Sequence, residues 1–263
     1  MQETAGFRVL VVVPTLGERR DSLERTLSSL SAGADSPIDL VMVCPLDTGP
    51  LRDIACRWGA RLILDQGHIS AAINRGFATA GPRHRYLAWI GDDDLLPAAA
   101  LLTSASLLEQ NPDAVLSYGD CEYIDSQGRN LFVRRPPRGA GWWMQFVPGL
   151  IKSEACLFRR DALLAVGGLD ERLRYAMDLD LILRLRSVGR VVRCPGITGK
   201  FGWHPGSITI TNRESSFTEA QLVQRRASRG LASWVSPLIQ PLLKRLFLSM
   251  CQRIDRRYTN AAR

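Results

Sequence analysis

The sequence predicts an α/β fold in which one mostly parallel sheet is flanked by helices. Short apolar runs alternate with segments of helical periodicity along the first half of the chain, and this alternation indicates βαβ units. With 46% hydrophobic and 23% charged residues, the 263-residue chain has enough apolar material for one large core. The predicted strands are residues 8–13, 39–43, 61–64, 86–90 and 114–118, and the helices between them are 19–31, 51–58, 69–80 and 98–109.

Each of these segments has its own local signal. The strands are continuous apolar runs such as RVLVVV, DLVMV and YLAWI, which is typical of parallel strands buried on both faces. Leu23, Leu27 and Leu30 recur on one face of the first predicted helix. The third helix is predicted to end at Gly81-Pro82, because proline cannot continue a helix.

The second half of the chain has a different character. Residues 134–146 are rich in Arg, Pro, Gly and Trp, so they are predicted to be irregular. We expect one domain over residues 1–212, followed by a basic, amphipathic helical tail over 213–263. Apolar periodicity and glycine stops predict the remaining strands at 156–158 and 190–193 and the remaining helices at 161–166, 178–188 and 214–229.

The net charge of +8 belongs to the tail. From Arg225 onward there are nine Lys or Arg and one acid, Asp255, so the first 224 residues hold 25 basic and 25 acidic side chains. A nucleic-acid-binding domain would carry a basic face on its folded part, so nucleic acid is not an expected partner. A basic tail fits an anionic lipid surface, and a solvated tail without a partner is the alternative.

Cysteine spacing and the distribution of apolar runs give an expectation about the compartment. The six cysteines are scattered without a CxxC pair, which is neither a zinc pattern nor a disulfide framework. No apolar run of signal-peptide length precedes the first predicted strand. No uninterrupted apolar stretch reaches the roughly 18 residues of a spanning helix. We therefore expect a cytoplasmic protein.

Polar residues follow the predicted strands, and ligands of parallel sheets bind beyond the carboxyl ends of the strands. We expect these residues to converge on one cleft: Pro14-Thr15, Cys44-Pro45, Asp65-Gln66-Gly67 and Gly91-Asp92-Asp93-Asp94. Three adjacent carboxylates repel one another, and they persist where a cation such as Mg²⁺ or Mn²⁺ compensates them. Capping of the following helix is the alternative, although one acid would suffice for a cap.

The segment DQGHISAAINRG contains candidates for donor binding. Gly67, next to Asp65, allows the backbone to approach a ligand closely. Asn74 and Arg75 lie near the end of the predicted short helix and can reach a phosphate or a ribose. An ordinary surface helix would have a similar sequence.

Two further sites are candidates for catalysis and metal binding. Asp178 and Asp180 begin a predicted helix and point in different directions, so they are not expected to act as a pair. One of them can face the cleft as a general base while the other pairs with Arg184. His204 is a candidate metal ligand in a protein that already needs a divalent ion, and a histidine satisfied by an ordinary hydrogen bond is the alternative.

Taken in order, these segments resemble an inverting glycosyltransferase of the family 2 type, which implies the GT-A fold. VVVPTLGERRDSLERTLSSL is similar to the family's opening strand, turn and helix. DQGHISAAINRGFATA and WIGDDDLLP are similar to its donor-binding helix and DxD-type acidic motif, and CLFRRDALLAVGGLDERLRYAMDLDLILRLRSVG to its acceptor-side block. The resemblance covers roughly residues 7–212, with a nucleotide-sugar half over about 7–120 and an acceptor half over about 121–212.

The resemblance implies transfer of a sugar from a nucleotide diphosphate to a hydroxyl acceptor, with inversion. Asp93 and His204 would hold the divalent metal, Mn²⁺ or Mg²⁺, and Asp92 would meet the donor ribose or diphosphate. Asp178 would be the catalytic base. The turn that lines the nucleotide would comprise Pro14, Thr15, Gly17 and Glu18.

The sequence departs from the family pattern at two places. Where the family has two acids after its second strand, one of which reads the nucleobase, this chain has Cys44-Pro45 with Asp47 nearby. The usual Glu-Asp pair at the base is Met177-Asp178, which retains the base itself. The missing acids make a non-catalytic protein that binds a sugar nucleotide or a partner the main alternative. A nucleotidyltransferase is the lesser one, because the loop after the first strand has a single glycine.

Two apolar features bear on the acceptor. Trp142, Trp143, Met144 and Phe146 form an apolar cluster that either packs in the core or provides a platform for a sugar ring or a lipid. The tail has the pattern of an interfacial amphipathic helix, which favours a lipid-linked acceptor, peripheral attachment to the inner face of the membrane, and a role in cell-envelope polysaccharide or glycolipid synthesis. Packing on its own domain, or on a second subunit in a homo-oligomer, is the alternative. The apolar tail residues are Trp234, Leu238, Leu242, Leu243, Leu246, Phe247 and Met250.

Overall fold

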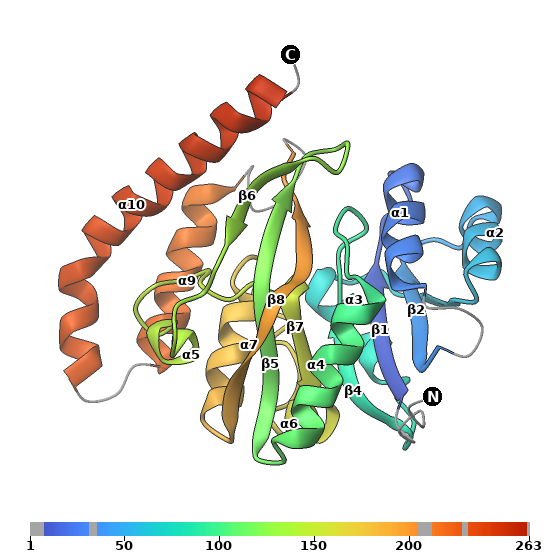
Figure 1. Ribbon diagram of the computed structural model, residues 1–263, viewed down its shortest axis with the longest axis horizontal. Coiled ribbons are helices and arrows are strands. Elements are labelled where there is room, and N and C mark those ends of the chain that lie inside the picture. Colours follow the sequence, from blue (N-terminus) through green and yellow to red (C-terminus); the bar gives the residue numbers. More distant parts are fainter. Residues whose placement is uncertain (1–7, 32–35, 205–211, 228–230, 262–263) are drawn as a thin grey trace.

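The computed structural model places one eight-stranded sheet between layers of helices (Figure 1). It describes residues 8–31, 36–204, 212–227 and 231–261. The strands are β1 (Arg8–Pro14), β2 (Ile38–Cys44), β3 (Arg61–Leu64), β4 (His84–Trp89), β5 (Ala114–Ile124), β6 (Asn130–Arg134), β7 (Cys156–Arg159) and β8 (Arg190–Gly202). The helices are α1 (Arg20–Leu30), α2 (Gly49–Arg57), α3 (Ile69–Phe77), α4 (Ala98–Gln110), α5 (Ala140–Trp143), η1 (Ser153–Ala155), α6 (Arg160–Ala165), α7 (Met177–Arg186), α9 (Arg213–Ala227) and α10 (Leu231–Ala261).

The first half of the chain forms the parallel part of the sheet, in the order β3-β2-β1-β4. The five side chains from Val9 to Val13 in the middle of β1 are fully buried, as predicted for a strand covered on both faces. The leucines of α1 pack on one face of β1, while Ile73 and Phe77 of α3 pack on the other. The predicted βαβ organisation is therefore confirmed.

The second half of the sheet is mixed and more extensive than predicted. β7 pairs antiparallel with both β4 and β5, and β5 pairs in parallel with β8. β5 and β8 continue well beyond the predicted ends at residues 118 and 193. Gly119, Asp120 and Pro195-Gly196 resemble turn residues in the sequence, but register shifts in the ladder accommodate the irregularity between the two strands.

The segment predicted to be irregular contains regular structure at both ends. β6 ends at Arg134 and pairs antiparallel with β5, a strand that the sequence did not predict. The four-residue helix α5 contains both Trp142 and Trp143. Propensity missed these elements because each is short and takes its stability from pairing or packing with segments distant in the chain.

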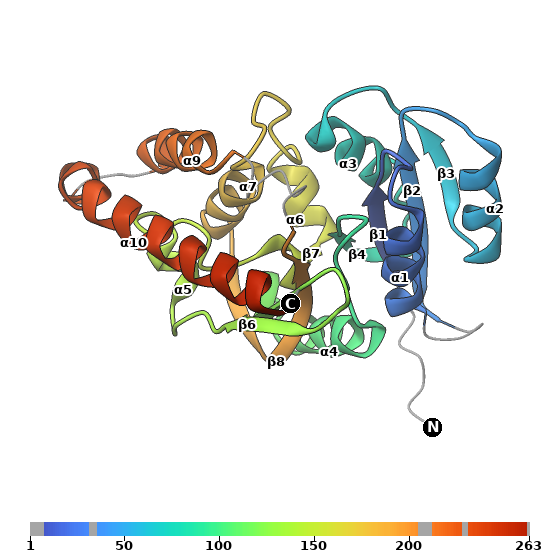
Figure 2. The same cartoon turned by 90° about the horizontal axis from the view of Figure 1, so that it is seen from above.

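The tail forms two helices, of which α9 packs beside α7 and α10 crosses over α9 and β6 (Figures 1 and 2). Cys251 and Ile254 of α10 are buried in a cluster with residues of β5, β6 and β8. Trp203 Nε1 donates a hydrogen bond to Asp255 Oδ1 over 3.1 Å, and Arg213 binds both oxygens of the same carboxylate at 2.8 and 2.9 Å. Part of the tail therefore packs on its own domain.

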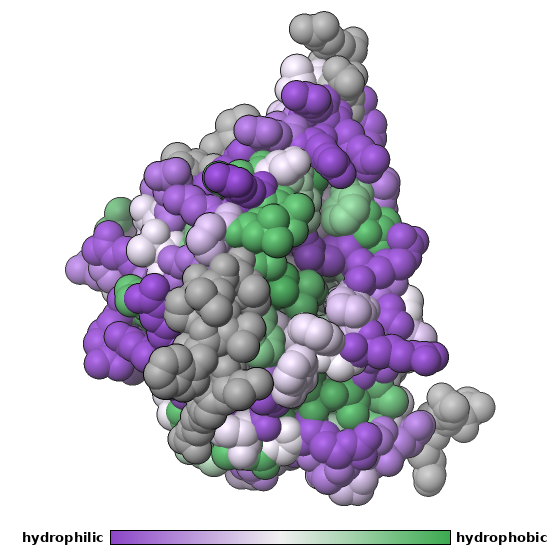
Figure 3. Space-filling model, turned by 90° about the vertical axis from the view of Figure 1, so that its left-hand side faces the viewer, coloured by the Kyte–Doolittle hydropathy of each residue, from purple (hydrophilic) through white to green (hydrophobic). Residues whose placement is uncertain are grey.

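The face of the molecule drawn in Figure 3 mixes apolar and polar side chains. Leu242 and Leu246 are 60% and 58% exposed. The side chains of Trp234 and Leu238, predicted for the same apolar face, lie outside the described part. No helix of the described chain is both long and apolar enough to cross a membrane.

Candidate functional site

A cavity of about 580 Å³ opens where the carboxyl ends of β1, β2 and β4 meet the loops of the second half. This is the edge of the sheet at which the sequence placed the ligand. The predicted site residues that line the cavity are Pro14, Thr15, Asp65, Gly67, Asp92, Asp93 and Asp178. Acids from β4 and from α7, which are distant in the sequence, therefore face one space.

Four other predicted donor-binding residues do not line this cavity. Gly17 adopts a φ of +77°, which favours glycine, and its N–H donates to Thr15 Oγ1 over 3.0 Å. It therefore shapes the turn that presents Thr15. Glu18 and Arg75 are exposed on the surface.

The fourth, Asn74, holds together the turn on the acceptor side. Its Nδ2 donates to the carbonyl of Leu169 over 2.9 Å and to Glu171 Oε1 over 3.0 Å. Its Oδ1 accepts the N–H of Leu169 at 2.9 Å. Its oxygen and its amide nitrogen are thus engaged in this turn, and donor binding by Asn74 stays a prediction.

Asp92 and Asp93 are held by groups from the end of β1 and the start of α1. The Thr15 hydroxyl donates to Asp92 Oδ2 over 2.6 Å, and Arg19 donates to Asp92 Oδ1 over 2.6 Å. The other terminal nitrogen of Arg19 donates to Asp93 Oδ2 over 2.9 Å. Burial raises the pKa of Asp92, while the bonds from Thr15 and Arg19 oppose that rise.

Arg19 is the cation that compensates these acids in the free protein, and sequence reasoning missed it. It lies just before α1, where two consecutive arginines resemble a solvated helix start. Its side chain is 42% exposed, whereas that of Asp92 is 6% exposed. A ligand can therefore reach the guanidinium more easily than the carboxylate beneath it.

Asp94 has a different role from its two neighbours. It is buried, and its Oδ1 accepts the N–H of Gly202 at the end of β8 over 2.7 Å. Burial raises the pKa of this carboxyl well above its usual range. The capping alternative is not supported, since the N-cap of α4 is Pro97 and receives no side-chain hydrogen bond.

His204 lies beside Asp93, as predicted. Its Nε2 is 2.6 Å from Asp93 Oδ2 and 3.1 Å from the nearest nitrogen of Arg19. A carboxylate and an imidazole are both ligands that Mn²⁺ accepts, and Mg²⁺ is often bound by one or two carboxylates together with substrate phosphates. Within the described residues no cluster of three or more His, Cys, Asp or Glu is arranged to hold a metal. The two side chains therefore fit a metal only if a ligand such as a diphosphate completes the site.

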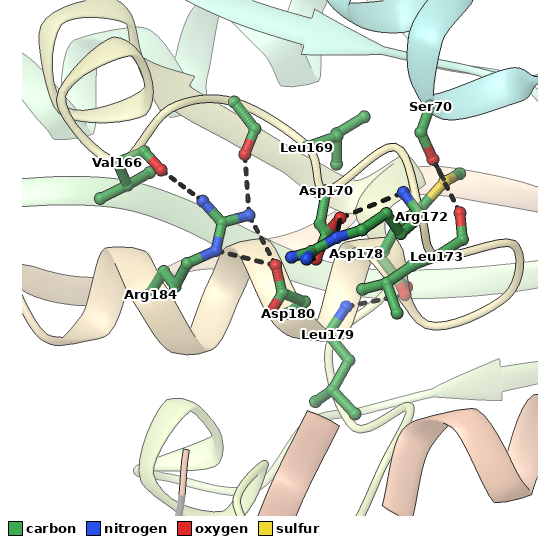
Figure 4. A network of polar contacts seen from close by, with 12 residues as sticks. Ser70, Val166, Leu169, Asp170, Arg172, Leu173, Asp178, Leu179, Asp180 and Arg184 are labelled. Carbon is green, nitrogen blue, oxygen red and sulfur yellow. Dashed lines mark hydrogen bonds and ion pairs between the residues drawn. The ribbon is translucent and has the colours of Figure 1, made fainter. Parts of the chain in front are cut away.

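The two aspartates of α7 point in different directions (Figure 4). Asp180 forms an ion pair with Arg184 at 2.6 Å, and Arg184 also donates to the carbonyls of Val166 and Gly168. Asp178 instead lines the cavity, with Oδ1 accepting the N–H of Leu179 over 2.8 Å. It is half-buried, and burial raises its pKa, while the nearby charge of Lys152 lowers it.

The carboxyl end of β2 borders the cavity but contributes no acidic side chain to it. Cys44 and Pro45 both line the cavity. Asp47, the only acid near them in the sequence, binds Arg52 through both carboxylate oxygens at 2.7 and 2.8 Å on the surface. The position at which the resembled family carries base-reading acids therefore presents a thiol and a proline.

The aromatic cluster of α5 lies away from this cavity. Trp142 and Trp143 are 49% and 45% exposed, with ring centroids 4.7 Å apart, whereas Phe146 is buried. None of the three lines the large cavity, although Trp142 borders a second one of about 570 Å³. The core-packing interpretation thus holds for Phe146 and for the fully buried Met144.

No family model matches the chain. Among curated proteins, O-antigen biosynthesis protein RfbC of Myxococcus xanthus is 28% identical over 190 residues, which is 67% of this chain and 14% of that protein. The uncharacterized protein y4gI of Sinorhizobium fredii is 25% identical over 231 residues, which is 81% of this chain and 24% of that protein. The chain thus spans less than a quarter of the length of each.

Solved structures show the same architecture across nearly the whole chain. A mannosyltransferase of Pyrobaculum calidifontis in complex with GDP-Man and Mn²⁺ superimposes with a TM-score of 0.61 at 14% identity, covering 97% of this chain and 87% of that one. The chain has a GT-A-like glycosyltransferase fold. TarS of S. aureus in complex with UDP-GlcNAc gives a TM-score of 0.60 at 12% identity over 82% of this chain and 65% of that one. At such identities the likeness concerns the fold, and the site must be argued from its own residues.

Proposed function

We propose that this protein transfers a sugar from a nucleoside-diphosphate sugar to a hydroxyl acceptor, with inversion at the anomeric carbon. One observation carries the proposal: Asp92 and Asp93, held by Thr15 and Arg19, face the same cavity as Asp178. The solved structures with this fold contain GDP-Man and Mn²⁺ in one case and UDP-GlcNAc in another. A role in cell-envelope polysaccharide synthesis is supported by the similarity to an O-antigen biosynthesis protein.

In the proposed reaction, Asp178 is the base and the nucleoside diphosphate is the leaving group. Asp178 accepts the proton of the acceptor hydroxyl while that oxygen forms a bond to the anomeric carbon. The bond from the anomeric carbon to the diphosphate oxygen breaks, and its electron pair leaves with the nucleoside diphosphate. Attack on the face opposite the leaving group inverts the configuration in one displacement, so no glycosyl-enzyme intermediate is needed.

The leaving diphosphate carries negative charge that the site must stabilise. Arg19 lies on Asp92 and Asp93 at the mouth of the cavity and can turn toward a phosphate, because its side chain is partly exposed. Asp93 and His204 would hold a divalent cation, Mn²⁺ or Mg²⁺, that neutralises the diphosphate when it is bound. Thr15, buried beneath them, would keep Asp92 oriented toward the donor.

The departure at Cys44-Pro45 favours a second candidate function, a sugar-nucleotide-binding protein without catalysis. Cys44 is buried, and burial raises the pKa of its thiol, so it is a neutral neighbour for a nucleobase. The half-buried Asp178 on the cavity wall has no purpose in such a protein. Hydrolysis or transfer of a donor sugar that requires a divalent ion excludes this alternative.

Asp178→Asn tests the proposed reaction because it removes the base but keeps the size and most hydrogen bonds of the side chain. We expect transfer to fall by about 10²- to 10⁴-fold, the usual contribution of a general base, while the dissociation constant of the nucleotide changes less than about twofold. The matched control is Asp161→Asn, a carboxylate exposed on α6. Loss of nucleotide binding in Asp178→Asn, or transfer at the control's rate, would contradict the assignment.

The donor must be identified before transfer by the Asp178→Asn variant can be measured. UDP, GDP, dTDP and their sugar conjugates are compared by thermal shift, each with Mn²⁺, Mg²⁺ or EDTA. A ligand at 100 times its dissociation constant stabilises the native state by about 2.7 kcal/mol. A metal-dependent shift with one nucleotide family identifies the donor class.

The acceptor and the location of the enzyme are parts of the same proposal. The basic tail and the exposed Leu242 and Leu246 of α10 support a lipid-linked acceptor reached at the inner face of a membrane. Burial of Cys251 and Ile254 against the domain limits the surface of α10 that remains for this contact. Leu242 and Leu246, near the middle of α10, would therefore face the lipid.

A further inference from the structure

The carboxylate of Glu219 binds three consecutive backbone N–H groups immediately before α7. The N–H groups of Arg174, Tyr175 and Ala176 donate to its Oε2 over 3.2, 2.5 and 2.7 Å. The N–H of Arg174 also donates to Oε1 over 3.0 Å. Glu219 belongs to α9 and follows Ala176 by 43 residues in the chain. One side chain of the tail thus supplies the acceptor for three successive peptide groups.

These peptide groups lead directly to the proposed base. α7 begins at Met177, so Asp178 is only two residues beyond Ala176. The backbone of residues 174–176 therefore determines where α7 starts and in which direction the Asp178 carboxylate enters the cavity. Asp178 and Ala176 both line that cavity, whereas Glu219 is not among the described residues that line it. Glu219 is thus placed to act on the backbone before Asp178 and not on a ligand.

The start and the middle of the loop over residues 169–176 are held from the other side, by α3. The Ser70 hydroxyl donates to the carbonyl of Leu173 over 3.1 Å (Figure 4). Asn74 binds the backbone of Leu169 through both its nitrogen and its oxygen. The end of the loop, next to the base, is the part that Glu219 holds.

α9 is a firm support for this contact. Val223 is buried in the main core cluster. The fully buried Gln224 donates to the carbonyl of Met144 over 2.8 Å, and Gln240 of α10 donates to Gln224 Oε1 over 3.0 Å. Because buried hydrogen bonds and apolar contacts fix the helix on two sides, the position of Glu219 relative to the core is fixed as well.

We propose that Glu219 is a positioning residue, which holds the end of this loop so that Asp178 is aimed at the acceptor hydroxyl. This inference rests on the proposed function and adds a residue of the tail to it. A general base must lie within hydrogen-bond reach of the proton that it accepts. A displacement of about 1 Å can lower the rate about 100-fold. The helix beyond residue 212 therefore belongs to the active site.

Two other roles for Glu219 give different kinetics. A carboxylate near the start of a helix also stabilises the fold through the helix dipole. If stability were its sole role, its loss would lower the thermal midpoint and leave kcat of the folded molecules unchanged. A direct contact with the donor would raise the dissociation constant of the nucleotide. A positioning residue lowers kcat and leaves nucleotide binding intact.

The test uses the full chain with Glu219→Gln, which removes the charge and one acceptor oxygen, and Glu219→Ala, which removes the whole contact. The matched control is Glu214→Gln on the same helix, whose carboxylate is 78% exposed and 3.7 Å from Lys244. Turnover is followed by release of UDP, GDP or dTDP from its sugar conjugate, with water or p-nitrophenyl glucoside as acceptor. All rates are measured well below each variant's thermal midpoint.

We expect kcat to fall about 10- to 100-fold in Glu219→Gln and further in Glu219→Ala, with a nucleotide dissociation constant within about twofold of the wild type. Glu214→Gln should turn over like the wild type. In the Asp178→Asn background, Glu219→Gln should lower the remaining rate less than about threefold, because residues that act through one group are not additive. An unchanged kcat, or an equal loss in both backgrounds, overturns the inference.

Amide hydrogen exchange tests the contact without any turnover. Exchange of residues 174–176 should be at least about 10-fold faster in Glu219→Gln, from the usual strength of a hydrogen bond to a charged group, and unchanged in Glu214→Gln. Equal exchange in Glu219→Gln and the wild type overturns the inference, whether or not the protein is active. Absence of turnover by the wild type refutes the proposed function, whereas turnover that does not depend on Glu219 refutes the positioning role alone.

Discussion

Replacing Arg19 by glutamine tests whether this side chain compensates the acids of the site in the absence of a ligand. Arg19 bridges Asp92 and Asp93 at 2.6 and 2.9 Å, and these carboxylates are 6% and 15% exposed. Removing one partner of a fully buried ion pair costs about 3–5 kcal/mol, whereas an exposed pair contributes about 0.2–1 kcal/mol. Because the Arg19 side chain is 42% exposed, an intermediate loss of about 2 kcal/mol is expected.

The assay is thermal unfolding at pH 7.5 with EDTA or with Mn²⁺. For a chain of this size, about 2 kcal/mol corresponds to a fall of about 4–8 °C in the midpoint. Millimolar Mn²⁺ should restore part of that loss in Arg19→Gln, because the ion replaces the missing positive charge between Asp93 and His204. Arg20→Gln, at the next and exposed position, is the matched control and should melt like the wild type.

The pH dependence of this loss has a defined sign. Burial raises the pKa of Asp92 and Arg19 lowers it, so the contribution of Arg19 is present while Asp92 is ionised and disappears as the pH falls and Asp92 is protonated. The difference between wild type and Arg19→Gln should therefore shrink toward acid pH. A midpoint equal to that of Arg20→Gln in EDTA at pH 7.5, or a difference that grows as the pH falls, would refute the compensating role.

Two further predictions concern the base and the tail. Burial raises the pKa of Asp178, and the charge of Lys152 opposes the rise. The transfer rate should therefore increase as the pH rises through the pKa of Asp178, which gives the pH–rate profile an acid limb. Lys152→Met should move this acid limb to higher pH. The control Lys200→Met should leave the limb in place, since Lys200 pairs with Glu122; an unmoved limb in Lys152→Met would contradict the coupling. The double variant Leu242→Glu, Leu246→Glu should no longer sediment with anionic phosphatidylglycerol vesicles. Its thermal midpoint should stay unchanged, since both leucines are exposed. Sedimentation equal to that of the wild type would exclude the membrane contact.

Local sequence patterns were sufficient to predict the parallel half of the sheet. The run from Val9 to Val13 is buried on both faces and consists of apolar residues throughout, so its pattern alone identifies the strand. The acids after β4 were placed at the ligand-binding edge because that rule depends on strand direction, which the βαβ order fixes. The different directions of Asp178 and Asp180 followed from helical geometry in the same way.

Other parts depended on contacts between segments distant in the chain. The sequence gives Asp92, Asp93 and Asp94 as three equivalent acids, and only tertiary contacts with Thr15, Arg19 and Gly202 give them different environments. The sequence also does not show that the Asn74 amide binds the backbone of Leu169, which is 95 residues away. Such partners leave no periodic signal in a single sequence.

The sequence by itself determined the order of strands and helices in the parallel half of the sheet, the edge of the sheet at which the acids lie, and the candidates Asp93, Asp178 and His204. These depend on periodicity and chain order, which act over a few residues or follow from topology. Only the tertiary structure decided that Arg19 pairs with the acids and that α10 lines the same cavity as Arg134 and Glu154. The physical reason is that charge compensation and burial are pairwise properties of side chains in space, and the distance along the chain does not limit them.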